Sequence, residues 1–223
     1  MSVMKIVAGI AAGLAASAAL VGCTTPSAPS MPSGSELDAQ FRSLLQSSFR
    51  AEGIAQLDRL QQDPGQAACS TGAPLPEVLA RKIEAEAQAS IKPPSDGRYL
   101  GDWKEGEKLA QSGRGMTWTD KSTTPSANGG SCYNCHQIGK AELSFGTIGP
   151  SLYQYGRLRG VSNPADPSAQ PMLTYTWGRL YNGWAYNACA NMPRFGHQQL
   201  LDETQMRHLM ALLLDPQSPV NQP

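Results

Sequence analysis

The stretch GGSCYNCHQIG (residues 129–139) contains two cysteines three positions apart and a histidine directly after the second, namely Cys132, Cys135 and His136. On one short helical turn, two thiols at this spacing reach the two vinyl groups along one edge of a haem, and the adjacent imidazole then points at the iron. The pattern is the attachment signature of c-type haem. It predicts one covalently bound haem c with His136 as the proximal axial ligand.

Two other chemistries use a similar pair of cysteines. A thioredoxin-like redox pair favours a strand-to-helix setting and needs no histidine, whereas a structural zinc site requires a second pair of ligands. The sequence has neither a second CxxC nor an HxxxH. We therefore interpret the motif as a haem site.

The composition sets outer limits on size and partners. The chain has 223 residues, and its 18 basic and 18 acidic side chains cancel, which argues against nucleic acid as a partner. Only 7% of the residues are aromatic, while 22 are glycine and 17 are proline. This composition is typical of a loop-rich protein with a modest core, which a cofactor with its own apolar surface would suit.

The first 22 residues are interpreted as a lipoprotein-type signal peptide. Lys5 provides the positive charge, and the apolar stretch from Ile6 to Leu20 is too short for a comfortable membrane span. It ends in Leu-Val-Gly-Cys23, which resembles a bacterial lipobox, the signal whose cysteine becomes the lipidated first residue. We expect a periplasmic protein held to the membrane only through Cys23. An ordinary signal peptide cleaved nearby is the alternative.

Helical periodicity recurs along the remainder, and the predicted fold class is all-α. Residues 23–35 form a Pro/Ser-rich flexible linker, residues 36–95 a helical N-terminal extension, and residues 96–223 a haem domain. The helical patterns cover residues 36–62 (as two short helices or one interrupted helix), 76–90, 102–111, 175–186 and 202–214. We expect Asp63-Pro64-Gly65 to end the first helical pattern, and Cys69 to lie in a turn-rich segment. Gly106 indicates either a close contact with another helix or a glycine that the helix merely tolerates. The tail up to Pro223 should be frayed.

The sequence offers few candidates for the residue that orients His136 and for the second axial ligand of the iron. A haem histidine keeps one ring nitrogen for iron and has the other hydrogen-bonded, and the Pro150 carbonyl is our candidate acceptor by similarity to class I cytochromes c. The position of Met192, before the last helix, resembles that of their axial methionine. His197 is the chief rival. Other candidates with less positional support are Met116, Met172, Met206 and His208.

Two cysteines remain after these assignments, Cys69 and Cys189. Pairing is the default in an exported protein, so we predict a disulfide between them. Such a bridge would connect the N-terminal extension to the loop that carries Met192. The alternative is that Cys189 is itself a haem ligand.

Together these stretches resemble the SoxX family, the monohaem cytochrome c subunits of the SoxAX complex of bacterial sulfur oxidation. The stretches that carry the resemblance are GDWKEGEKLAQSGRG (101–115), GGSCYNCHQIG (129–139), GTIGPSLYQYGRLRG (146–160) and NACANMPRFG (187–196). They extend over most of residues 96–214. The lipobox is a departure, because many members are free periplasmic proteins.

The resemblance implies a class I cytochrome c-like domain and a role in thiosulfate oxidation. SoxX proteins form a heterodimer with the haem protein SoxA, and the complex couples thiosulfate oxidatively to a cysteine of the carrier SoxYZ. The sulfur chemistry belongs to SoxA. This chain would therefore be a non-catalytic subunit that relays electrons to a small cytochrome or oxidase. A stand-alone electron carrier, or the cytochrome subunit of another periplasmic dehydrogenase, is the alternative.

Overall fold

The regular secondary structure in the described part of the chain is helical. The computed structural model describes residues 31–223, and the expected signal peptide and Cys23 lie outside them. Over these residues the regular elements are α-helices and short 3-10 helices, and no strand forms. The prediction of an all-α protein is confirmed. Within the same residues, every helix is too short or too polar to cross a membrane.

The chain forms two compact units that divide between Leu44 and Leu45. Helix α1 (Gly34–Ser48) begins in the first unit, and none of its residues is buried. The short 3-10 helix η1 (Leu57–Leu60) belongs to the second unit. The helical period over residues 36–62 therefore corresponds to two separate helices, with Gly53 in the interval between them.

The first helical pattern ends before Asp63, as predicted, and the sequence Asp63-Pro64-Gly65 also begins a new helix. Helix α2 (Pro64–Cys69) follows Asp63, whose side chain accepts a hydrogen bond from the Gln66 backbone N–H at 2.7 Å. Aspartate is a strong N-cap and proline suits the first helical turn, so the residues that end one pattern start the next. The expected turn around Cys69 is accordingly wrong, because Cys69 is the last residue of α2. Helix α3 (Glu77–Ser90) then follows Pro76, as predicted.

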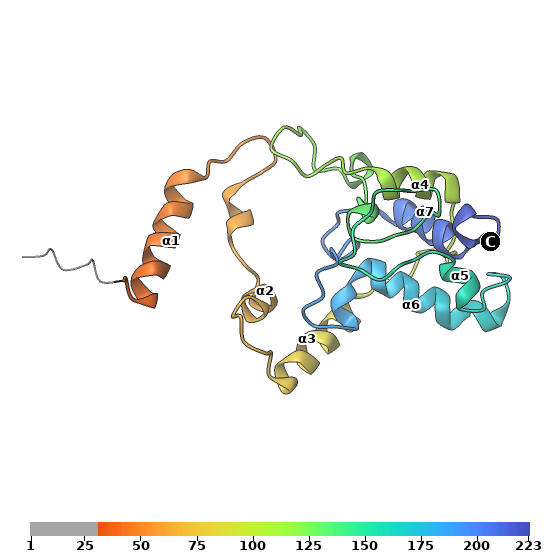
Figure 1. The fold of residues 1–223 in the computed structure, drawn as a ribbon, viewed down its shortest axis with the longest axis horizontal. Helices are drawn as coiled ribbons and strands as arrows, with labels where there is room; N and C mark the ends of the chain where they lie inside the picture. Colours follow the sequence, from red (N-terminus) through yellow and green to blue (C-terminus); the bar gives the residue numbers. More distant parts are fainter. Residues whose placement is uncertain (1–30) are drawn as a thin grey trace, which may run out of the picture. The chain divides into compact units, whose positions relative to one another are not determined.

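Helices α4 (Trp103–Gln111) and α7 (Glu203–Leu214) pack side by side and form the centre of the main core (Figure 1). A side chain at Gly106 would overlap the His208 carbonyl, so the close helix contact expected at this glycine is present. Both helices begin directly after a capping aspartate, Asp102 and Asp202, where the helical patterns over residues 102–111 and 202–214 start. The core includes Ala110, Ile138, Trp177, Leu209, Met210, Leu212 and Leu214.

Helices α5 (Tyr155–Leu158) and α6 (Gln170–Tyr181) pack on α7. The periodicity predicts a helix over residues 175–186, but α6 begins and ends five residues earlier. Proline in its first turn starts it, and the side chain of Asn182 accepts from the Trp184 N–H at 3.3 Å to begin the separate 3-10 helix η5 (Gly183–Ala185).

The C-terminal tail is ordered by its own side chains. Residues Pro219–Asn221 form the 3-10 helix η6, in which Val220 is buried. Asn221 accepts from the Gly156 backbone N–H at 2.9 Å and donates to the Leu213 carbonyl at 3.1 Å. The frayed tail expected from its Pro/Gln composition is wrong for these residues, because the amide of Asn221 satisfies buried backbone groups of two helices.

Candidate functional site

The CYNCH motif forms a single tight turn. The 3-10 helix η3 (Cys132–Asn134) begins after Ser131, which adopts left-handed backbone angles (φ 51°, ψ 33°). The Cys132 carbonyl then accepts from the backbone N–H groups of Cys135 at 3.1 Å and of His136 at 2.9 Å. Both cysteines remain free thiols. The turn thus presents two sulfurs and one imidazole from five consecutive residues.

The imidazole of His136 is held in a defined orientation. Its Nδ1 lies 2.7 Å from the Pro150 carbonyl oxygen. A carbonyl only accepts, so Nδ1 carries the proton and Nε2 is the nitrogen with a free lone pair. The predicted partner Pro150 therefore lies where it fixes both the tautomer and the angle of the ring.

The loop that carries Pro150 wraps around the turn. The backbone N–H of Gly149 donates to the Cys135 carbonyl at 2.8 Å, and that of Leu152 donates to the Gln137 carbonyl at 2.7 Å. The α-carbon of Gly149 lies directly against the His136 ring, so closely that a β-carbon would overlap the ring atoms. A glycine before Pro150 is thus a geometric requirement of this site.

We expect Gly149→Ala to displace His136 and to weaken the hydrogen bond to Pro150. Overpacking of this kind lowers the free energy of unfolding by about 1–3 kcal/mol, which chemical denaturation would measure. Gly34→Ala is the matched control, because no atom lies within 4 Å of its added β-carbon. If Gly149→Ala were as stable as the control, the close packing of ring and loop would be refuted.

Tyr133 connects the motif to helix α4. Its hydroxyl donates to the Glu107 carboxylate at 3.0 Å and accepts from the Gly139 N–H at 3.1 Å. Burial, together with the nearby Glu107 charge, raises the pKa of this phenol. No sequence pattern predicted this contact, because Glu107 precedes Tyr133 by 26 residues and reads as an ordinary helix-surface acid.

The geometry argues against the two alternative chemistries. Within residues 31–223, no group of three His, Cys, Asp or Glu side chains is placed to hold a metal ion. Cys132 packs against the main core, and desolvation raises the pKa of its thiol to about 12. The packing of Cys132 against the core differs from the partly exposed, electropositive surroundings of redox-active cysteines. The turn therefore suits sulfurs and an imidazole that address different points of one large ligand.

Met192 and His197, the two rival distal ligands, have different surroundings. Met192 is half-buried and packs against the main core cluster, as Cys132 does. His197 is exposed and lines a separate pocket with Asp63, Trp184 and Arg194. Burial and the Arg194 charge lower the pKa of His197.

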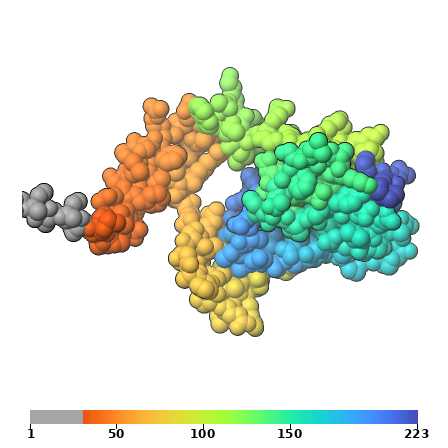
Figure 2. All heavy atoms as spheres, viewed as in Figure 1, coloured from red at the N-terminus to blue at the C-terminus, as the bar shows by residue number. Residues whose placement is uncertain are grey.

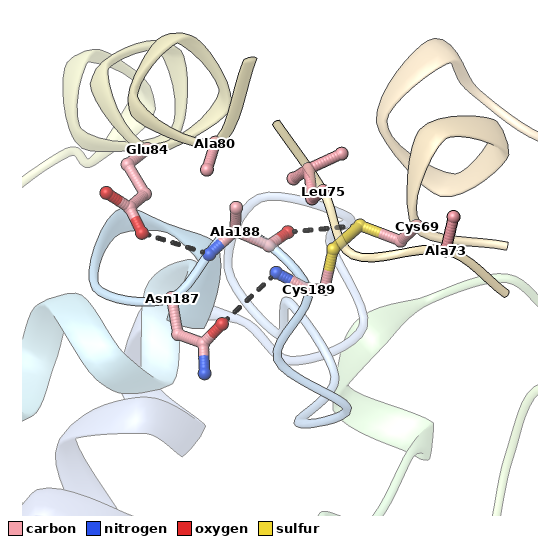
Figure 3. Close-up of a pocket in the computed structure, with 8 residues that line it drawn as sticks. All are labelled: Cys69, Ala73, Leu75, Ala80, Glu84, Asn187, Ala188 and Cys189. Atoms are coloured by element: carbon pink, nitrogen blue, oxygen red, sulfur yellow. Dashed lines mark hydrogen bonds between the residues drawn. A yellow bond between two sulfur atoms is a disulfide. The ribbon is translucent and has the colours of Figure 1, made fainter. Parts of the chain in front are cut away.

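Cys69 and Cys189 form a disulfide, the pairing predicted by subtraction. The Cα atoms are 5.6 Å apart and the bridge spans 120 residues of sequence. Figure 3 shows Cys69 from α2, Glu84 from α3 and the segment Asn187–Cys189 around the bridge. The Ala188 backbone N–H donates to Glu84 Oε1 at 3.3 Å. Cys189 is thus consumed in the bridge, which leaves no thiolate to bind a haem iron.

The fold and site define an all-helical protein with a thiol–thiol–imidazole turn and a disulfide-linked N-terminal extension. No known protein-family profile matches the chain. A protein of Aquifex aeolicus (strain VF5), described as an uncharacterized lipoprotein, is 36% identical over 166 residues, which are 72% of this chain and 73% of that protein. The chain belongs to the same family as this lipoprotein.

Proposed function

We propose that the chain is an electron-transfer protein that carries one covalent haem c. Cys132 and Cys135 would hold the haem edge through thioether bonds, and His136 would bind the iron through Nε2. When bound, the haem supplies reversible one-electron oxidation and reduction of its iron. The observation that carries the proposal is the 2.7 Å contact of His136 Nδ1 with the Pro150 carbonyl, next to two thiols left free.

The residues present fit this group. The free Nε2 of His136 is the nitrogen an iron requires, and the hydrogen bond at Nδ1 increases its basicity. The apolar side chains Leu109, Cys132, Leu152, Met172, Tyr181 and Met192 pack on the main core yet remain partly exposed. A porphyrin would cover apolar surface of this kind.

Met192 is the proposed distal ligand. A thioether is a soft ligand that favours Fe(II) and raises the haem potential, which suits an electron acceptor. Its half-buried place on the same core cluster as Cys132 supports this choice over the exposed His197. The contact of α4 with α7 at Gly106 supports a class I cytochrome c-like domain, in which the first and last helices cross at such a contact.

We further propose that the chain is a SoxX-like subunit. In the SoxAX reaction, an S–S bond forms between thiosulfate and the SoxYZ cysteine, while the thiol proton and two electrons leave. The SoxA haem would host this chemistry, and the present chain would accept the electrons singly and pass them to a small cytochrome or oxidase. Its own Cys132, Cys135 and His136 would be occupied by the haem, so its role would be non-catalytic.

The lipobox and the relative's name together support a lipid anchor. The Aquifex protein is described as a lipoprotein, and this chain has Leu-Val-Gly-Cys23 at the end of an apolar segment. We propose a periplasmic protein attached to a bacterial membrane through Cys23, at the end of the linker over residues 23–35.

The deciding experiment is a thiosulfate-dependent reduction assay. The purified haem protein is mixed with SoxA, with SoxYZ, with both or with neither, and the reduced haem spectrum is recorded after thiosulfate is added. Reduction only in the complete mixture is expected. A redox-active haem that thiosulfate never reduces in the complete mixture would favour the alternative, a stand-alone carrier or a subunit of another dehydrogenase.

A further inference from the structure

The loop over residues 187–197, which carries Met192, is held both by the N-terminal extension and by residues close to it in sequence, such as Tyr181. This loop lies between η5 and α7 and contains no helix. At its C-terminal end, the backbone N–H groups of Gly196 and His197 donate to the Tyr181 carbonyl. Near its start, Cys189 is bound covalently to Cys69, and the Ala188 N–H donates to Glu84. Next to Met192, the loop residue Arg194 makes a further contact with the extension, through its ion pair with Asp63.

Arg194 is a buried cation with a partner in the extension. Its side chain is 9% exposed, and its Nη2 lies 2.7 Å from Asp63 Oδ2. Partial burial opposes ionisation of Asp63, but hydrogen bonds from the Gln66 backbone N–H and from Arg194 outweigh it and keep the pKa of Asp63 below its ordinary value. Because Asp63 also caps α2, its carboxylate is fixed by both the helix and the guanidinium.

Trp184 joins this pair to the loop. The guanidinium carbon of Arg194 lies 4.2 Å from the centroid of the Trp184 ring system, and the indole Nε1 donates to the Ala190 carbonyl at 2.9 Å. The backbone of Gly65 lies against the same indole. Trp184, Ala188, Ile83 and Ala87 form a second small core, in which α3 packs against η5. In Figure 2, the yellow atoms of the part that contains α3 lie beside blue atoms of the C-terminal part.

We propose that residues 63–90 act as a brace that holds the 187–197 loop and keeps Met192 in place as a haem ligand. This proposal rests on the proposed function. Asp63 and Arg194 would act as positioning residues, because their ion pair fixes the loop two positions from the methionine. The brace determines how often Met192 leaves the iron and therefore how readily a foreign ligand replaces it.

The test uses Asp63→Asn in the full-length haem protein. Asparagine is as good an N-cap as aspartate, so the substitution removes the charge of the ion pair and leaves the start of α2 intact. The affinity of the ferric haem for imidazole is measured by optical titration. We expect Asp63→Asn to bind imidazole about tenfold more tightly, which corresponds to about 1.4 kcal/mol.

Glu77→Gln is the matched control, because it removes an exposed ion pair with Arg81 on the same extension. Its imidazole affinity should equal that of the wild type. Amide hydrogen exchange over residues 187–197 gives a second readout that does not depend on any iron ligand. Exchange should rise in Asp63→Asn and in the double variant Cys69→Ala/Cys189→Ala, and stay at the wild-type level in Glu77→Gln.

The outcomes separate the two proposals. Unchanged imidazole affinity and unchanged loop exchange in both Asp63→Asn and the double cysteine variant would overturn the brace. A wild-type protein without covalent haem, or without a methionine ligand, would overturn the proposed function instead. In that case hydrogen exchange alone still decides whether residues 63–90 hold the loop.

Discussion

Replacement of both Cys132 and Cys135 by alanine is expected to give a protein with no covalently attached haem. The two thiols are the free cysteines of residues 31–223, so no other side chain there can form a thioether to the vinyl groups. His136 alone would bind haem reversibly, and denaturation would release it. Haem staining on a denaturing gel and the mass of the intact protein measure the loss directly.

The other pair of cysteines provides the control. In Cys69→Ala/Cys189→Ala the attachment motif is untouched, so covalent haem should remain. The double variant should instead be less stable, because removing a native disulfide typically lowers the free energy of unfolding by about 2–5 kcal/mol. Haem that survives denaturation of the Cys132→Ala/Cys135→Ala protein would refute the assignment of CYNCH as the attachment site.

The second large effect is expected for Met192→Ala. Loss of the thioether should remove the near-infrared sulfur-to-iron charge-transfer band. It should also lower the midpoint potential by on the order of 100 mV or more, since axial ligands tune haem potentials over about 0.8 V. Absorption spectroscopy of the ferric protein and a redox titration measure the two quantities independently.

Met172→Ala is the matched control, because Met172 is another partly buried methionine on the same core cluster. It should keep the band and a potential close to that of the wild type. An unchanged band in Met192→Ala would exclude Met192 as the ligand. Loss of the low-spin spectrum in His197→Ala would then identify the rival histidine.

The helices that the sequence predicted well are those with local start signals. Pro76, Asp102 and Asp202 each stand directly before a helix, and the side chains of Asp102 and Asp202 accept hydrogen bonds from backbone N–H groups in the first turn. Errors arose where one residue serves two elements. Asp63 follows one helical pattern and caps the next helix, and Asn182 caps η5 inside what resembles a single helical pattern.

In the candidate site, too, the residues that sequence could predict are close together along the chain, and those it could not predict are far apart. The turn at Cys132–His136 is local, and its residue spacing is sufficient to find it. Pro150, 14 residues after His136, can be assigned by similarity to class I cytochromes c. Asp63 and Arg194 are 131 residues apart, and each reads alone as an ordinary surface charge. Such a pair is determined by tertiary packing, so no pattern in one sequence reveals it.

The disulfide also bears on how the protein matures. The four cysteines at positions 69, 132, 135 and 189 permit three complete pairings. Under the proposed function, the thioether bonds would form from the thiols of Cys132 and Cys135, so a bridge that captures either cysteine would have to be reduced before haem could be attached. The Cys69–Cys189 bond encloses the motif without using it. The native bridge thus withdraws Cys69 and Cys189, which could otherwise pair with the motif cysteines, and under the proposed function it leaves both thiols of the motif available for haem attachment.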